Sequence, residues 1–285
     1  MIEVTKEDIK YFNEISSKGD NDVANKKRES IICNILNRNF PEDFFQDPQW
    51  SALRHGLTMI FGTTVSCEMK AGRVYNYDFL INNEKIEFKY NASDVSDTPQ
   101  FVSPGKISEF FDKISYEEFY FDKYLPILAN AWGLALPGKE EYLKHIGSSN
   151  PKCMEEYKRR YDGATSNNPA KRTNSLKDRL FSDMAKKIAD DSIEEFILNN
   201  DLNISKLSEY LLRSQKDKKY LLYKNGTFRK QVLGENNYII DECLERTKNT
   251  YKVMTRAGKI LSVLLRWKNG KGIAFPAFQI RLLNN

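Results

Sequence analysis

The spacing of apolar residues changes at Gly62, and this change constrains the fold more than any other feature of the chain. Before Gly62, apolar residues recur at helical spacing over residues 23–36 and 50–61. After it, apolar and polar residues alternate as in strands, in three short segments separated by turn-forming residues: 63–69, 74–81 and 85–90. We therefore expect a meander of three antiparallel strands, preceded by helices.

The second half of the chain has a different pattern. Residues 147–175 are polar and interrupted by Gly, Ser, Asn and Pro, which favours a flexible loop or lobe boundary between two helical stretches. The chain ends in strand-like segments, over residues 220–223, 238–244, 260–267 and 272–282. Asn269-Gly270 predicts a hairpin turn between the last two. We expect an α/β protein with domains at 1–146 and 147–285, or one continuous domain.

Composition excludes several classes of protein. The 285 residues are 40% hydrophobic, enough for a substantial core. We expect neither a signal peptide nor a membrane-spanning segment, because no long apolar run is present. The four cysteines are scattered and only two histidines occur, without the close spacing of a zinc site. Reduced thiols in a cytoplasmic protein are the expectation.

Two acids and an amine are predicted to meet on the strand meander. Side chains alternate across a strand, so Glu87 and Lys89 share one face while Phe88 lies on the other. The short turn after the second strand brings Asp78 alongside them. Two neighbouring carboxylates repel each other, and a divalent cation neutralises them. Oxygen ligands of this kind suit Mg²⁺, which activates phosphodiesters toward water.

The pattern Glu-x-Lys is not specific by itself, since it occurs three times in the chain. Glu156 lies in a charged helical stretch, and Glu68 ends the first strand with no Asp on a preceding strand. Only Glu87-Phe88-Lys89 follows an Asp by one hairpin within an apolar strand. The alternative is a surface strand whose solvated face happens to display Asp78, Glu87 and Lys89.

The segment Tyr77-Asp78-(x8)-Glu87-Phe88-Lys89, preceded by a helix and a strand, resembles the core of the PD-(D/E)XK nuclease superfamily. One departure is that Tyr77 stands where the family signature has Pro. The resemblance covers residues 23–91 and implies a restriction-endonuclease-like core, a central mixed sheet flanked by helices. It implies Asp78 and Glu87 as Mg²⁺ ligands and Lys89 as the catalytic lysine.

In many members of the superfamily a Glu on the first core helix completes the site, and Glu29 is the similar residue here. It lies on the apolar face of its helix, where a carboxylate needs a partner. Glu68 is the competing candidate for this third ligand. The alternative for Glu29 is an ion pair with Lys26 or another cation.

The last hairpin, over Leu264–Ile273 and Pro276–Gln279, resembles the tails of some type II restriction endonucleases and is the candidate DNA-recognition element. Basic side chains contact phosphates, and Gln or Asn read adenine edges. A hairpin that caps the core with solvated lysines explains the same residues equally well. The candidates are Arg266, Lys268, Asn269, Lys271 and Gln279, with Arg281 nearby.

These observations together predict a magnesium-dependent endonuclease that hydrolyses double-stranded DNA at a short specific sequence. A homodimer is expected because two-fold DNA sites favour two-fold proteins. A cognate methyltransferase acting on the same site is a further partner to test for. A repair or junction-resolving nuclease is one alternative, and a non-catalytic DNA-binding module on the same fold is another.

Overall fold

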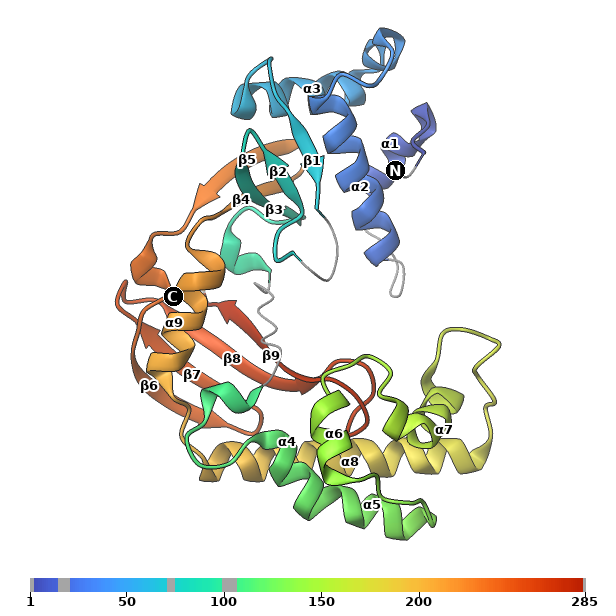
Figure 1. Ribbon diagram of the computed structural model, residues 1–285. Coiled ribbons are helices and arrows are strands. Elements are labelled where there is room, and N and C mark those ends of the chain that lie inside the picture. Colours follow the sequence, from blue (N-terminus) through green and yellow to red (C-terminus); the bar gives the residue numbers. More distant parts are fainter. Residues whose placement is uncertain (1–2, 15–20, 71–74, 99–106, 284–285) are drawn as a thin grey trace. The chain divides into compact units, whose positions relative to one another are not determined.

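The chain forms two compact units, shown in Figure 1. The computed structural model describes residues 3–14, 21–70, 75–98 and 107–283. The first unit comprises Met1–Pro99 and Leu212–Glu235, and the second comprises Gln100–Leu211 and Asn236–Asn285. Each unit contains its own β-sheet.

The sheet of the first unit is mixed and has five strands in the order β1-β2-β3-β4-β5. β3 and β4 are parallel, whereas the other neighbouring pairs are antiparallel. The strands span Cys67–Met69 (β1), Phe79–Ile81 (β2), Glu84–Tyr90 (β3), Lys218–Lys224 (β4) and Thr227–Val232 (β5). The mixed sheet expected for an α/β protein is therefore present.

Asparagines make the turn between β2 and β3 tight. Asn82 and Asn83 both have positive φ angles, 48° and 66°, a conformation that Asn tolerates better than most residues. This turn sets the register in which Phe79 lies opposite Ile86. The predicted hairpin after the second strand is confirmed.

Two helices cover one face of this sheet. They are α2 (Asn21–Leu36) and α3 (Pro48–Phe61), which follow the short α1 (Ile9–Asn13). The side chain of Asp47 caps the start of α3 by accepting hydrogen bonds from the backbone of Gln49 and Trp50, and α3 ends at Gly62. The helices pack their apolar side chains on the inward-facing residues of the strands, which include Phe79, Ile81, Ile86, Phe88, Leu221 and Tyr223.

The second unit combines helices with a four-stranded antiparallel sheet in the order β6-β7-β8-β9. The strands span Ile240–Thr247 (β6), Thr250–Thr255 (β7), Ile260–Trp267 (β8) and Pro276–Leu282 (β9). The helices span Tyr116–Phe119 (α4), Leu125–Trp132 (α5), Lys139–His145 (α6), Glu155–Thr165 (α7), Leu176–Asn199 (α8) and Ile204–Gln215 (α9). α9 crosses the boundary between the units after Leu211.

A buried polar link joins helix and sheet in the second unit. The indole N–H of Trp267 on β8 donates to the hydroxyl of Tyr116 on α4 at 2.9 Å, and that hydroxyl also contacts Oγ of Ser192 on α8 at 2.9 Å. Both aromatic side chains are buried, so this link orients the large rings at the centre of the unit.

Three expectations need correction. The chain does not divide at residue 146, because residues 212–235 return to the first unit, where β4 pairs with β3. The segment 147–175 contains the helix α7, whose charged residues pair with each other along the helix. The last hairpin forms, but its turn is longer than the two residues Asn269-Gly270, because the backbone N–H of Asn269 donates to the carbonyl of Ala274.

Among the residues that the structure describes, no helix is both long enough and apolar enough to cross a membrane.

Candidate functional site

The structure brings Asp78, Glu87 and Lys89 together on the face of the first sheet opposite α2 and α3. Asp78 lies directly before β2, and its backbone continues the strand pairing, since its N–H donates to the carbonyl of Ile86 at 2.9 Å. Glu87 and Lys89 alternate along β3 with the buried Ile86 and Phe88. The predicted convergence of two acids and one amine is found in the structure.

Both carboxylate oxygens of Glu87 accept a hydrogen bond from an ammonium group. Nζ of Lys89 lies 2.5 Å from Oε1, and Nζ of Lys218 lies 2.8 Å from Oε2. The Lys218 side chain is only 1% exposed, whereas those of Glu87 and Lys89 are each 13% exposed. Although burial opposes ionisation, the two ammonium groups hold the pKa of Glu87 below its ordinary value.

The pKa of Asp78 is shifted in the opposite direction, above its ordinary value. Burial, and then the nearby charge of Glu87, raise the pKa of Asp78 to about 6. Its Oδ2 accepts a hydrogen bond from the backbone N–H of Phe88 at 2.8 Å, which fixes the carboxyl group beside β3. A buried acid with a raised pKa next to a second carboxylate is a common arrangement in catalytic and metal-binding sites.

Sequence reasoning missed Lys218, the fourth member of the cluster. It is the first residue of β4 and lies opposite Lys85 in the parallel pairing, so its side chain shares the face of Glu87. Nζ of Lys218 also donates to the carbonyl of Asn76 at 3.0 Å. A local signal exists, because this lysine begins a strand whose residues 220–223 are all buried. The partner, however, becomes visible only once β3 and β4 are paired.

The candidates for a third metal ligand differ in their surroundings. Glu29 is buried on α2, with 7% of its surface exposed, as expected from its position on the apolar face. Glu68 has a side chain 62% exposed and forms an ion pair with Lys70. Over the described ranges, no three His, Cys, Asp or Glu residues are grouped so that they could hold a metal ion. Glu29 is thus the more buried of the two candidates, and its role as a metal ligand stays a prediction.

The candidate DNA-contacting residues lie in the second unit, at the β8–β9 hairpin. Arg266 is exposed and donates a hydrogen bond to Oε1 of Gln279 at 2.7 Å. Lys271 forms an ion pair with Asp190 of α8 at 2.8 Å. Nζ of Lys268 lies 4.5 Å from the ring centre of Phe275. Arg266 and Gln279 thus present adjacent polar groups on one sheet face, while Lys271 is already paired with an acid.

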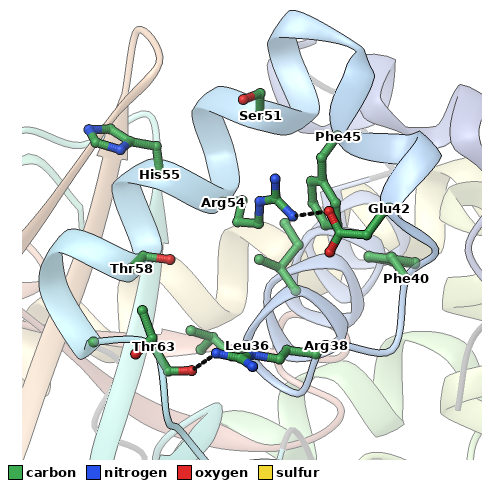
Figure 2. A pocket seen from close by; sticks show the side chains of 12 residues that line it. Leu36, Arg38, Phe40, Glu42, Phe45, Ser51, Arg54, His55, Thr58 and Thr63 are labelled. Atoms are coloured by element: carbon green, nitrogen blue, oxygen red, sulfur yellow. Dashed lines mark hydrogen bonds and ion pairs between the residues drawn. The ribbon is translucent and has the colours of Figure 1, made fainter.

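The first unit also contains a cavity of about 470 Å³ between the end of α2 and α3 (Figure 2). Arg54 enters it, pairs with Glu42 at 2.8 Å, and stacks its guanidinium group 3.8 Å from the ring centre of Phe45. Arg38 donates to the carbonyl of Thr63 at 2.6 Å. His55 is exposed and points away from both arginines in Figure 2, as expected for a surface histidine.

Comparisons with known proteins found nothing similar. No protein-family model matches the chain, and no curated protein and no solved structure matches it either.

Proposed function

We propose that this protein is a magnesium-dependent endonuclease acting on double-stranded DNA, with a restriction-endonuclease-like core of the PD-(D/E)XK superfamily. The observation that carries the proposal is the meeting of Asp78, Glu87 and Lys89 on one sheet face. The mixed sheet with helices on one face agrees with the fold that the resemblance implies. A short specific recognition sequence, a homodimer and a cognate methyltransferase belong to the same proposal.

The two carboxylates fit a magnesium ion. Mg²⁺ is commonly held by one or two carboxylates while it keeps several waters, so Asp78 and Glu87 suffice as protein ligands. Burial, and then the nearby charge of Glu87, raise the pKa of Asp78, and a divalent cation between the two carboxylates would stabilise their ionised forms. A bound Mg²⁺ would polarise the scissile phosphate and supply a nucleophilic water.

Lys89 provides the cationic group at this site. Its ammonium donates three hydrogen bonds and, beside a phosphate, neutralises charge that develops during hydrolysis. Its side chain is 13% exposed, so it is accessible from solvent to a phosphate bound at this sheet face. Asp78 and Glu87 are held in place by the backbone N–H of Phe88 and by Lys218.

DNA recognition is assigned to the β8–β9 hairpin. Arg266 on β8 would contact a phosphate or a guanine, and Gln279 on the neighbouring β9 would contact an adenine. Lys271 must leave Asp190 before it binds a phosphate, so its contribution should be smaller than that of Arg266. Asn269 and Lys268 lie in the same hairpin and complete the proposed contact set.

Plasmid cleavage tests the proposal. The wild type should cut supercoiled and linear duplex DNA with Mg²⁺ and lose all activity with a chelator. Asp78→Asn should abolish cleavage, and Lys89→Met should lower its rate by about 10²- to 10⁴-fold. Glu68→Gln is a matched control, because Glu68-Met69-Lys70 repeats the Glu-x-Lys pattern at an exposed ion pair, and this variant should cut normally.

Folded wild-type protein that leaves many different DNA sequences intact with Mg²⁺ would contradict the proposal. Discrete fragments from linear duplex would indicate sequence-specific cutting. Cleavage only at branched or damaged DNA would instead favour a repair or junction-resolving nuclease.

One observation favours the alternative of a non-catalytic DNA-binding module. Asp78, Glu87, Lys89 and Lys218 carry two negative and two positive charges, so the cluster is balanced as a set of structural ion pairs. A structural cluster of this kind would bind no divalent cation. Calorimetric titration of the wild type with Mg²⁺ separates the two functions, since an enzyme must bind the metal and the module need not.

A further inference from the structure

The two lysines that contact Glu87 differ in how deeply they are buried. Lys89 is on β3 itself, and its 13% exposed side chain has access to solvent. Lys218 enters from β4, is 1% exposed, and is held at a second point by the carbonyl of Asn76. We therefore expect an incoming cation to displace the more exposed Lys89 rather than Lys218, whose side chain is almost fully buried.

This difference assigns unequal roles to the two oxygens of Glu87. Oε1 contacts Lys89, the more exposed lysine, and Oε2 contacts Lys218, the more buried one, at 2.8 Å. If Lys218 retains its hydrogen bond to Oε2, a metal ion can bind Glu87 only through Oε1. It also places a fixed positive charge next to the metal site, which weakens cation binding.

We propose that Lys218 is a positioning residue that limits Glu87 to a single-oxygen contact with the metal and lowers the affinity of the site for divalent cations. In the metal-free protein, Lys218 neutralises Glu87 so that the acid pair can be buried without a bound ion. Metal binding then replaces Lys89 at Oε1 and releases its ammonium group toward the substrate. The inference rests on the proposed function only in requiring that Asp78 and Glu87 bind a divalent cation.

Calorimetric titration with Mn²⁺ and Mg²⁺ tests the inference on the full-length protein. Lys218→Met removes the fixed charge and frees Oε2, and both changes act in the same direction. Binding of the cation should become at least about tenfold tighter. Removing one positive charge next to the cation changes the binding free energy by more than a tenfold change in affinity requires. Lys218→Arg keeps the charge and should bind metal within about threefold of the wild type.

Lys89→Met is the matched control, since both lysines contact the same carboxylate. Its effect on metal affinity should be smaller than that of Lys218→Met, because in this proposal Lys89 leaves Glu87 when the cation binds, whereas Lys218 stays next to the cation. If Lys218→Met is too unstable for calorimetry, thermal unfolding with and without Mn²⁺ gives the same information. The metal should then raise the melting temperature of this variant more than that of the wild type.

The possible outcomes separate this inference from the function. A wild type that binds neither cation removes the proposed function, and this inference with it. A wild type that binds metal, with Lys218→Met binding equally or more weakly, overturns the inference alone and shows that Lys218 supports the ligand geometry. Tighter binding by Lys218→Met supports it, because a merely structural lysine would not increase metal affinity when removed.

Discussion

The ion pair between Glu87 and Lys218 should make a large contribution to the stability of the metal-free protein. Glu87→Gln removes one charge and keeps the shape of the side chain, and Lys218→Met removes the other. Glu87→Gln leaves the buried ammonium group of Lys218 without the carboxylate that it contacts, whereas Lys218→Met leaves Glu87 still paired with Lys89. Glu87→Gln should therefore lower the free energy of unfolding by about 3–5 kcal/mol, the range found when one member of a buried pair is removed, and Lys218→Met should lower it by less.

The structure gives the scale of the interaction. Two unit charges 2.8 Å apart attract each other by about 6 kcal/mol at an effective dielectric constant of about 20. Desolvation of both groups offsets much of this attraction. The double variant removes both charges, so it should lose less stability than the two single variants combined. We expect a coupling energy of about 2–3 kcal/mol.

Urea denaturation in the presence of a chelator, followed by far-UV circular dichroism, measures all four proteins of this cycle. The ion pair of Lys187 and Asp191 is a suitable control, because its side chains are 75% and 50% exposed. Its coupling energy should stay below about 1 kcal/mol. Single variants at Glu87 and Lys218 that each cost less than about 1 kcal/mol, with additive effects, would refute the reasoning.

Three further predictions concern other parts of the chain. Asn37→Ala should lower the free energy of unfolding by about 1–3 kcal/mol in urea titrations, because the Asn37 amide makes two hydrogen bonds to the backbone of Cys67 on the edge strand β1, at 2.9 and 2.7 Å. Gly272→Ala should lower the melting temperature, because its φ of +71° strains an L side chain and the new Cβ would collide with the hydroxyl of Tyr120. Burial and a neighbouring arginine lower the pKa of Lys268 to about 8 from its ordinary 10.5, so the unfolded chain binds more protons than the folded chain between these values. The melting temperature of the wild type should thus rise relative to that of Lys268→Met from pH 8 to about 10.5, and a constant difference would contradict the shift.

Features set by neighbouring residues were predictable from the sequence. The helices α2 and α3 follow from apolar spacing, and the end of α3 follows from Gly62. The β2–β3 hairpin follows from two asparagines that tolerate positive φ. Once that hairpin forms, alternation alone places Glu87 and Lys89 on one face and brings Asp78 beside them. The Asp78, Glu87 and Lys89 part of the candidate site is local, and local rules find it.

Strands without an apolar pattern were not predictable in the same way. β5 (Thr227–Val232) is mostly polar, and its Val232 is 57% exposed, so it lacks the alternation of a half-buried strand. It forms because β4 offers unpaired backbone groups at its edge. α7 was predicted only in part: the charged stretch around Glu156 indicates a helix, whereas the Gly, Ser, Asn and Pro residues of 147–175 indicate a loop. Ion pairs along the helix, such as that of Lys158 with Asp162, become visible only in the structure.

Lys218 is a member of the charged cluster that the sequence motif around Asp78, Glu87 and Lys89 does not identify. The acids and Lys89 lie within a dozen residues of one another, whereas Lys218 is 131 residues beyond Glu87 and reaches it only through the parallel pairing of β3 with β4. The same pairing returns residues 212–235 to the first unit and defeats a division of the chain at a single boundary. A parallel neighbour requires a long connection, so no local spacing rule can identify it. The sequence motif identifies groups able to bind a cation, but the affinity of the site depends on a charge that only the tertiary fold supplies.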